Sequence, residues 1–309
     1  MKSDKIKGTI CGIIAAITYG TNPLGALNLY AEGINVDSVL FYRYGLAVVI
    51  LALMLLVMRT PLRISRREFF ICGFLGIMFA ISSLTLYSSF HYMDAGVAST
   101  ILFIYPVMVA VLMAVFFKER VTAVTVISII LALSGIGLLY KGGDGTTLSL
   151  IGVLLVMLSS LTYAIYMITV NKSGLSLSPI KLTFYVMLCG VLAIILHSLF
   201  RQENHIRLLT TASQWGWGLM LALVPTVISL LLMVVAVRQI GSTPTAIMGA
   251  LEPVTAVVIG VTIFHEAFTL RLAAGIVLIL IAVMLIIAGK SIRFPKGAKM
   301  KVKTENMFK

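Results

Sequence analysis

The amino-acid sequence predicts an all-α polytopic membrane protein in which ten transmembrane helices form two inverted five-helix repeats. Composition is the first reason: 60% of the residues are hydrophobic, 11% are charged, and the mean hydropathy is +1.08. These values lie far outside the range of soluble domains. The second reason is a succession of apolar stretches as long as a membrane span. The third is a pattern of residues that occurs twice along the chain.

The apolar stretches have about 20 residues each, the length that a helix needs to cross a hydrocarbon core of about 30 Å. In chain order, the ten stretches cover residues 8–30, 38–58, 69–90, 95–117, 121–140, 149–170, 180–199, 215–237, 243–264 and 268–289. The first follows the basic start MKSDKIKG. Because it is full length and shows no small-residue cleavage site, we expect it to be retained as a helix rather than removed as a signal peptide. No segment remains for a soluble domain.

Small and sulfur-containing residues inside these stretches suit close helix packing. Gly8 and Gly12 form a small-residue step one helical turn apart, which lets two helices approach closely in lipid. Cys11, Cys72 and Cys189 all fall inside apolar stretches and lack the spacing of metal ligands, so we expect them to be packing residues.

Basic residues predict the orientation, because Lys and Arg near helix ends are retained on the cytoplasmic side. Alternate connections differ sharply in this respect. One set contains Lys2, Lys5, Lys7, Arg59, Arg63, Arg66, Arg67, Lys118, Arg120, Lys172, Lys181, Arg238 and the tail from Lys290 to Lys309. The other set contains Lys141, Arg201, Arg207 and Arg271. We therefore expect both termini in the cytoplasm and the chain in the inner or plasma membrane.

The repeated pattern is FFKERVT at residues 116–122 and IFHEAFT at residues 263–269. A shift of 147 positions superimposes Pro106 on Pro253 and Glu119 on Glu266. Five apolar stretches lie between the two copies. Because an odd number of membrane spans brings the chain to the opposite side, the second copy has the inverted orientation in the membrane. The first copy then turns in the cytoplasm and the second outside, where Lys118 becomes His265 and the positive charge is lost.

A second echo supports the duplication. A shift of 144 positions places Gly8, Thr18 and Tyr19 on Gly152, Thr162 and Tyr163. The expected units are a first repeat at residues 1–144, a second repeat at residues 145–290 and a basic cytoplasmic tail at residues 291–309. Inverted repeats are a recurring plan of secondary transporters, which bind substrate at the midplane between the halves.

Three motifs carry a resemblance to a known family: FYRYG around Arg43, YPVMVAVLMAVFFKE in the fourth stretch and LEPVTAVVIGVTIFHE in the ninth. In this order, and with the repeat, they resemble the EamA-type family of the drug/metabolite transporter superfamily over nearly the whole chain. The resemblance implies a ten-helix transporter with a central cavity lined by both halves, often an exporter of a metabolite or amino acid. The family is chemically diverse, so the resemblance names no substrate.

Two charged residues at membrane depth are candidates for the cavity, because buried charges are costly and tend to face a cavity or a partner. Arg43 lies roughly 7 Å inside the outer end of the second helix and could instead snorkel outward. Glu252 lies on the order of 13 Å from the cytoplasmic end of the ninth helix, next to Pro253. It either stabilises the kink as a structural group or contacts substrate. In the second case it either pairs with Arg43 or carries a proton.

Polar side chains also follow one face of several helices. The sixth stretch carries Ser159, Thr162, Tyr163 and Tyr166 at helical spacing, the first carries Thr18, Tyr19 and Asn22, and the third carries Ser82, Thr85 and Ser89, with Tyr87 near its outer end. Lipid-facing polar groups lack partners, which favours a shared cavity. The expected substrate-binding residues are Tyr19, Asn22, Arg43, Tyr87, Tyr163, Tyr166 and Glu252.

Other classes of function are less well supported. A membrane-embedded enzyme needs a catalytic constellation, but His265 and Glu266 begin an HExxH zinc motif whose second histidine position holds Thr269. The phosphate-loop-like residues Gly289 to Ser291 lack the earlier glycine of that motif. A passive channel suits inverted repeats less well than alternating access does. We expect no cofactor, metal or nucleic acid, and as partners the lipid bilayer and a small-molecule substrate.

The basic tail has two possible roles. Its lysines could bind anionic lipid, each contributing about 1 kcal/mol near the surface. Alternatively the tail only determines topology, which is the interpretation that we favour.

Overall fold

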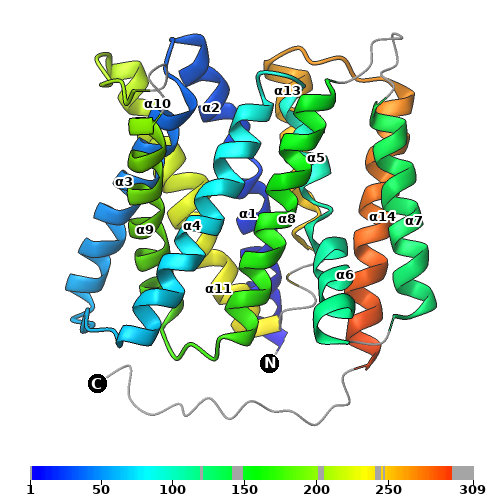
Figure 1. Ribbon diagram of the computed structural model, residues 1–309, viewed down its shortest axis with the longest axis horizontal. Coiled ribbons are helices and arrows are strands. Elements are labelled where there is room, and N and C mark those ends of the chain that lie inside the picture. The colour runs from blue at the N-terminus through cyan, green and yellow to red at the C-terminus, as the bar shows by residue number, and fades with distance from the viewer. Residues whose placement is uncertain are drawn as a thin grey trace.

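The computed structural model describes residues 2–118, 121–140, 149–200, 205–240, 245 and 248–293, and all regular structure within them is helical (Figure 1). The helices are α1 (Lys2–Tyr19), α2 (Asn22–Ala31), α3 (Val36–Val57), α4 (Arg66–Ser89), α5 (Ala95–Leu102), α6 (Tyr105–Phe117), α7 (Ala123–Tyr140), α8 (Leu150–Lys172), α9 (Pro179–Phe200), α10 (Ala212–Ala222), η2 (Leu223–Ile228), α11 (Ser229–Ile240), α13 (Leu251–Ile263) and α14 (Leu270–Arg293). Glu119, Arg120, Lys141, Arg201, the expected boundary at residue 144 and the tail beyond residue 293 lie outside the described residues.

Within the described residues, eight helical segments are long and apolar enough to cross a membrane. They are Lys5–Ala31, Val36–Val57, Arg66–Ser89, Ala95–Phe117, Leu150–Lys172, Pro179–Phe200, Ala212–Ile240 and Leu270–Ile287. The fifth and ninth expected stretches appear as the shorter apolar helices Ala123–Leu139 and Leu251–Ile263. The ninth is short because a turn at Gly249 and Ala250 precedes it, and Pro253 lies in the first turn of the helix, where its missing N–H group costs no helical hydrogen bond.

Prolines interrupt three more of the expected spans. Turns at residues 20–21 and 103–104 separate α1 from α2 and α5 from α6, in each case just before a proline, Pro23 or Pro106. The Asn22 side chain donates to the Tyr19 carbonyl at 2.8 Å and so satisfies a main-chain group at the first break. Between α10 and α11, Pro225 lies in the π-helical turn η2. Irregular backbone of this kind is tolerated at membrane depth where it is buried in protein or lines a cavity.

Hydrogen bonds assign the connections to two opposite faces. On one face, Lys181 Nζ donates to the Arg63 carbonyl at 2.6 Å, joining the α3–α4 connection to the start of α9. On the other, Arg207 Nη1 donates to the Gly33 carbonyl at 2.7 Å, joining the α2–α3 and α9–α10 connections. α1 begins and α14 ends on the first of these faces (Figure 1). A chain whose first helix begins and whose last helix ends on the same face crosses between the two faces an even number of times.

The first face is also the basic one within the described residues, as the sequence predicts. It carries Arg59, Arg63, Arg66, Arg67, Lys118, Lys172 and Lys181, whereas the second carries Arg207 and Arg271.

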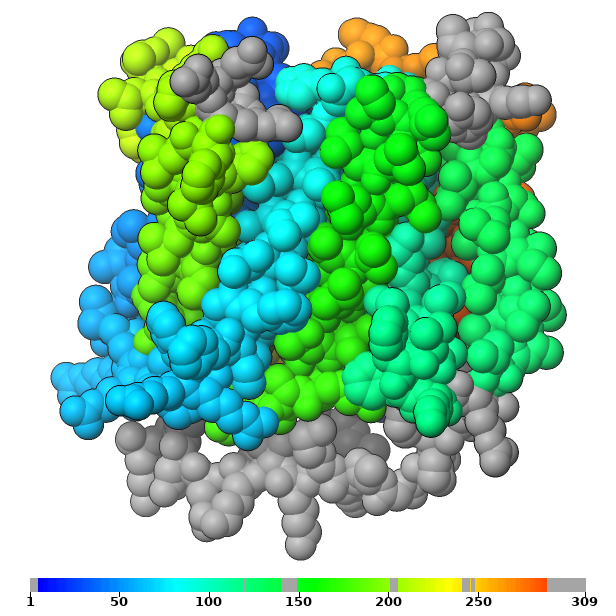
Figure 2. Space-filling view, viewed as in Figure 1, coloured from blue at the N-terminus to red at the C-terminus, as the bar shows by residue number. Residues whose placement is uncertain are grey.

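Close helix contacts follow the small residues. A Cβ added at Gly12 would lie 2.6 Å from Met248 Sδ, one at Gly76 would lie 2.5 Å from Cys189 Cβ, and one at Gly135 would lie 2.9 Å from the Gly275 carbonyl. α4 packs along α8 across one face of the molecule (Figure 2). α1 packs against α11, α5 against α13, and α7 against α14. The three cysteines are free thiols.

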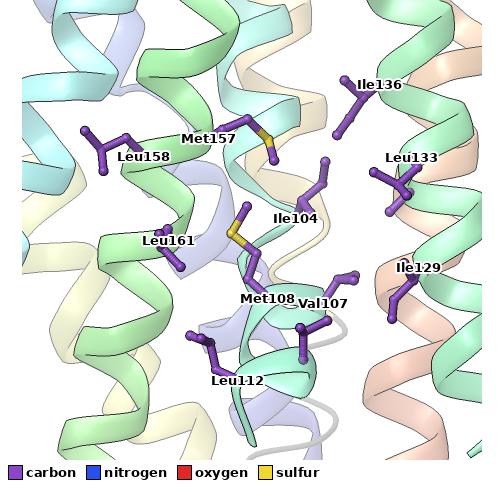
Figure 3. Close-up of a pocket in the computed structure, with 12 residues that line it drawn as sticks. Ile104, Val107, Met108, Leu112, Ile129, Leu133, Ile136, Met157, Leu158 and Leu161 are labelled. Atoms are coloured by element: carbon purple, nitrogen blue, oxygen red, sulfur yellow. The ribbon is translucent and has the colours of Figure 1, made fainter. Parts of the chain in front are cut away.

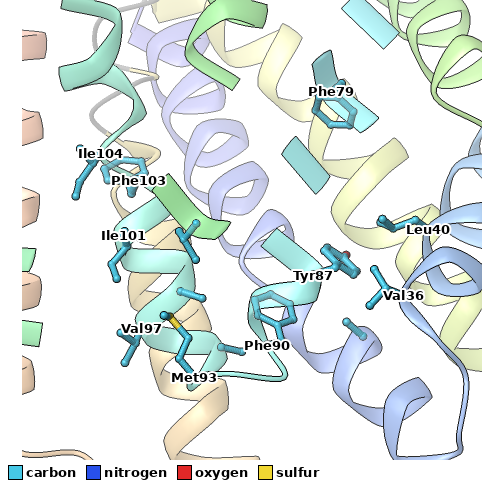
Figure 4. Packing of buried hydrophobic residues seen from close by; sticks show 14 of the residues in the cluster. Val36, Leu40, Phe79, Tyr87, Phe90, Met93, Val97, Ile101, Phe103 and Ile104 are labelled. Atoms are coloured by element: carbon cyan, nitrogen blue, oxygen red, sulfur yellow. The ribbon is translucent and has the colours of Figure 1, made fainter. Parts of the chain in front are cut away.

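The core and the outer surface are both apolar, as a protein in lipid requires. Figure 4 shows part of the core cluster, in which Tyr87 and Phe90 lie near the end of α4 and Ile101, Phe103 and Ile104 end α5 and begin the turn after it. Large apolar side chains also point outward; Val57, for example, is 83% exposed. We interpret the outward-facing side chains as the lipid-facing belt.

Candidate functional site

A cavity of about 40 Å³ lies where interrupted helices meet. It is lined from both halves of the chain by Tyr19, Asn22, Arg43, Phe79, Ser82, Ser83, Leu86, Ser99, Leu102, Phe103, Tyr105, Tyr163 and Glu252. Tyr19 ends α1, Asn22 begins α2, Tyr105 begins α6 and Glu252 lies in the first turn of α13. The structure therefore brings five of the seven expected residues to one cavity wall.

Arg43 is held by hydroxyl groups and aromatic rings. Its Nη1 donates to the Tyr87 hydroxyl at 2.8 Å and its Nε donates to Thr226 Oγ1 at 3.1 Å. The guanidinium carbon lies 5.6 Å from the ring centroids of both Tyr44 and Tyr87, a cation–π arrangement. Since Arg43 is only 3% exposed, the outward snorkelling alternative is wrong.

Two hydroxyl partners of Arg43, Tyr87 and Thr226, connect it to neighbouring parts of the fold. Tyr87 donates its own hydroxyl hydrogen to Asn22 Oδ1 at 3.1 Å, so it links Arg43 to the first helix break. Tyr87 lies near the end of α4, as expected, and is completely buried behind the cavity wall. Thr226 was not expected from the sequence. The π-helical turn η2 carries its hydroxyl, which also donates to the Leu221 carbonyl at 2.9 Å. Insertions of this kind occur frequently at functional sites.

Glu252 reaches the cavity without a partner. No described residue forms a hydrogen bond or ion pair with its carboxylate, and the pairing with Arg43, one of the alternatives left open by the sequence, is absent from the described contacts in this conformation. The carboxylate lies within electrostatic range of the Tyr19, Tyr105 and Tyr163 phenols.

Aromatic rings form one wall. Tyr163 packs edge to face on Tyr105, with centroids 4.7 Å apart, and stacks on Tyr166, with centroids 5.7 Å apart. Tyr166 also contacts Phe79 at 5.4 Å, but it supports Tyr163 from behind and does not line the cavity.

Tyr105 was missed in the sequence. The 147-position shift that matches Pro106 with Pro253 places Tyr105 on Glu252, and this signal could have identified it. The two residues occupy equivalent positions at two helix breaks and line the same cavity.

Most hydroxyl residues of the polar stripes donate to main-chain carbonyls instead of facing the cavity. Ser82 Oγ donates to the Ser159 carbonyl at 3.1 Å, and Ser159 Oγ donates back to the Ser82 carbonyl at 2.6 Å, between α4 and α8. Thr18 and Thr162 donate to carbonyls of their own helices. Ser82 also lines the cavity, so it serves both purposes.

Glu266, from the repeated pattern, caps another helix. Its carboxylate accepts from the main-chain N–H groups of Ala95 at 2.8 Å and Gly96 at 3.3 Å, at the start of α5. A Cβ at Gly260 would lie 2.0 Å from a Glu266 carboxylate oxygen, so only glycine allows this approach. The contact joins the two halves on the less basic face. It gives the glutamate of IFHEAFT a structural role.

A second cavity, of about 360 Å³, is apolar throughout (Figure 3). Ile104, Val107 and Met108 line it at the start of α6, Ile129 and Leu133 face it from α7, and Leu158 and Leu161 face it from α8. It offers no polar group to orient a ligand.

Comparisons with known proteins agree with this architecture. The chain matches the EamA-like transporter family over residues 6–141 and 150–288. The uncharacterized transporter YcbK of Bacillus subtilis (strain 168) is 24% identical over 278 residues, or 87% of each chain. The uncharacterized transporter YvbV of the same organism is 26% identical over 208 residues, or 63% of this chain and 64% of YvbV.

One solved crystal structure has a similar fold, with a TM-score of 0.65 at 15% identity over 93% of this chain and 99% of that chain. At this identity the likeness concerns the fold alone. The family match covers most of the chain in two consecutive segments, and the helices around the cavity, apart from the shorter α13, belong to segments with the length and apolarity of membrane spans. This multi-pass membrane protein therefore belongs to the EamA-like transporter family.

Proposed function

We propose that the chain is a secondary transporter that exports a small metabolite or amino acid by alternating access between two inverted five-helix repeats. The observation that carries this proposal is the make-up of the cavity wall. Tyr19 and Tyr163 are equivalent under the 144-position shift, and Tyr105 and Glu252 are equivalent under the 147-position shift. One cavity thus receives the same positions from both halves, as expected for a site on the pseudo-two-fold axis of inverted repeats.

A pair of interhelical hydrogen bonds supports the inverted repeat. Ser82 Oγ donates to the Ser159 carbonyl at 3.1 Å, between α4 and α8. The equivalents of these two residues are Ser229, by the 147-position shift, and Ala15, by the 144-position shift. Ser229 Oγ donates to the Ala15 carbonyl at 2.9 Å, between α11 and α1. The same contact therefore occurs twice with the roles of the two halves exchanged.

Two glycine contacts follow the same rule. A Cβ at Gly8 would meet Gln239 Cβ and an Ile240 methyl group, each at 2.8 Å. A Cβ at the equivalent Gly152 would meet Tyr92 Cβ at 3.0 Å and the Met93 methyl at 2.7 Å. Tyr92 and Met93 are the 147-position equivalents of Gln239 and Ile240. Gly8 lies near the start of α1 and Gly152 near the start of α8. An inverting two-fold axis that exchanges the two halves would relate these two contacts to each other.

Orientation follows from charge. The face that carries most of the basic residues within the described ranges is the cytoplasmic one by the positive-inside rule, and the cap formed by Glu266 lies on the outer face. Export, and not import, rests on the family resemblance. The inner or plasma membrane is the location that we propose.

Counterflow in proteoliposomes tests the proposal. Purified protein is reconstituted, vesicles are loaded with one compound of a metabolite panel at high concentration, and uptake of the same labelled compound is followed. A transporter with alternating access gives saturable uptake and a transient accumulation above the external concentration. Vesicles without protein are the control.

Two outcomes would contradict the proposal. Flux that is linear in concentration and gives no transient accumulation indicates a passive channel. Chemical conversion of the compound, detected by mass spectrometry of the recovered label, indicates a membrane-embedded enzyme.

A further inference from the structure

We propose, resting on the transport function above, that the cavity selects zwitterions, with the anionic group of the substrate facing Arg43 and the cationic group facing Glu252. The charges of the wall carry this inference. Arg43 is the basic residue and Glu252 the acidic residue of the lining, and no ion pair joins them among the described contacts.

Two separated opposite charges in a low-dielectric cavity define a dipolar site. An attraction between charges grows as the local dielectric constant falls, and a buried charge left without a counter-charge is costly. A ligand with one charge would neutralise one end and leave the other uncompensated. A zwitterion compensates both ends and keeps the occupied cavity neutral.

The Arg43 end is built to receive an anion. Its partners, the hydroxyl groups of Tyr87, Thr226 and Tyr19, are neutral, so they position the guanidinium without cancelling its charge. These bonds use at most three of the five guanidinium N–H groups, and a carboxylate is the planar acceptor that suits those remaining. Asn22 lies beside this end through its bond with Tyr87.

The Glu252 end is built to receive a cation. Its carboxylate has no partner among the described residues, although it lies in a wall of buried groups. The Tyr105 and Tyr163 rings are within electrostatic range of it, and aromatic rings attract an ammonium group.

Size limits the ligand. A cavity of about 40 Å³ holds a few atoms beyond one water molecule, so this conformation suits a short zwitterion, and a larger side chain requires the cavity to open.

A charge series of constant shape tests the inference. Alanine, ethylamine and propionate share a short carbon chain, and leucine, isopentylamine and 4-methylpentanoate share a longer one. Each is titrated calorimetrically into purified protein in lipid nanodiscs. The expected result is that at least one zwitterion binds ten-fold or more tightly than the amine and the acid of its own series. Equal or tighter binding of the amine or the acid, or no binding of either zwitterion, would overturn the inference.

Substitutions test whether Arg43 binds the anionic group of the substrate and Glu252 the cationic group. Glu252→Gln is expected to erase the preference for the zwitterion over the acid, because the Arg43 end still binds the carboxylate. Arg43→Gln is expected to erase the preference over the amine. Glu32→Gln, on the outer face, is the matched control and should keep the wild-type pattern. If Arg43→Gln does not fold, Glu252→Gln and the wild-type series still decide, and an unchanged preference in Glu252→Gln contradicts the assignment.

The two proposals fail separately. If zwitterions bind as expected but show no counterflow, the binding inference stands and the transport function is wrong. If counterflow occurs with a singly charged compound and no zwitterion binds, the transport function stands and the inference is wrong.

Discussion

At the scale of single residues, Arg43 joins three parts of the fold. It donates from two different nitrogens to Tyr87 on α4 and Thr226 in η2. A lysine has one compact ammonium group and cannot hold both hydroxyls in the geometry of the planar fork. We predict that Arg43→Lys lowers the free energy of unfolding by about 2 kcal/mol, since a hydrogen bond to a charged group contributes about 1.5–3 kcal/mol. Thermal unfolding in detergent measures the loss.

Thr226→Ala provides the control for this prediction. It removes one of the two acceptors, so it should destabilise less than Arg43→Lys. The double variant should lose less than the sum of the single variants, because both changes remove the same hydrogen bond. Strict additivity would contradict the assignment of Thr226 as a positioning residue for Arg43.

Glu266 gives a prediction on pH. Burial raises the pKa of its carboxyl above the ordinary value of 4.5, and the nearby Asp94 carboxylate adds to the effect, while the N–H groups of Ala95 and Gly96 oppose it. The folded protein therefore binds this proton more tightly than the unfolded chain does. The stability that it contributes is fully present below the ordinary pKa and is lost as pH rises through the raised value.

The matching variant is Glu266→Gln, which resembles the protonated carboxyl. Its melting temperature should equal that of the wild type at acid pH and exceed it increasingly as pH rises, in melting curves recorded over that range. Glu266→Ala should be less stable at every pH, by about 1 kcal/mol, because the start of α5 loses its cap. A Gln variant that loses stability relative to the wild type as pH rises would contradict the sign.

At the scale of helices, the breaks matter because they bring backbone segments together. A Cβ added at Gly20, in the turn between α1 and α2, would lie 2.6 Å from both the Glu252 carbonyl and Thr255 Cβ of α13. We predict that Gly20→Ala pushes α1 away from α13, costs about 1–3 kcal/mol as overpacking does, and reduces counterflow. Gly45→Ala in α3 meets nothing within 4 Å and is the control, expected to be neutral or stabilising. Equal effects of the two substitutions would contradict the close approach.

At the scale of the whole molecule, topology can be tested from described surface positions. Single cysteines are introduced at Leu208, which is 77% exposed on the less basic face, and at Arg63 on the basic face, after Cys11, Cys72 and Cys189 are replaced by alanine. A membrane-impermeant thiol reagent added to intact cells should label Leu208→Cys and should label Arg63→Cys only after permeabilisation. The reverse labelling would invert the proposed orientation.

Local chemistry made part of the site predictable. Arg43 and Glu252 stand out because a formal charge is costly in an apolar stretch, and Pro106 and Pro253 mark breaks because proline cannot continue a helix. Tyr19, Asn22 and Tyr163 could be found from their helical spacing and the repeat. Thr226 could not, because one threonine in an apolar helix carries no signal of its own, and the π-helical turn that aims it at Arg43 depends on packing.

The sequence by itself determined the membrane class, the helical segments, the basic face and the family, because these depend on composition, spacing and charge along the chain. Tertiary structure alone decided which polar groups meet. It separated Arg43 from Glu252, gave Arg43 neutral hydroxyl partners, turned Ser82 and Ser159 toward each other, and placed Tyr166 behind Tyr163. Such contacts join residues far apart in the chain, and helix rotation and close approach at glycines, which local sequence does not specify, determine them.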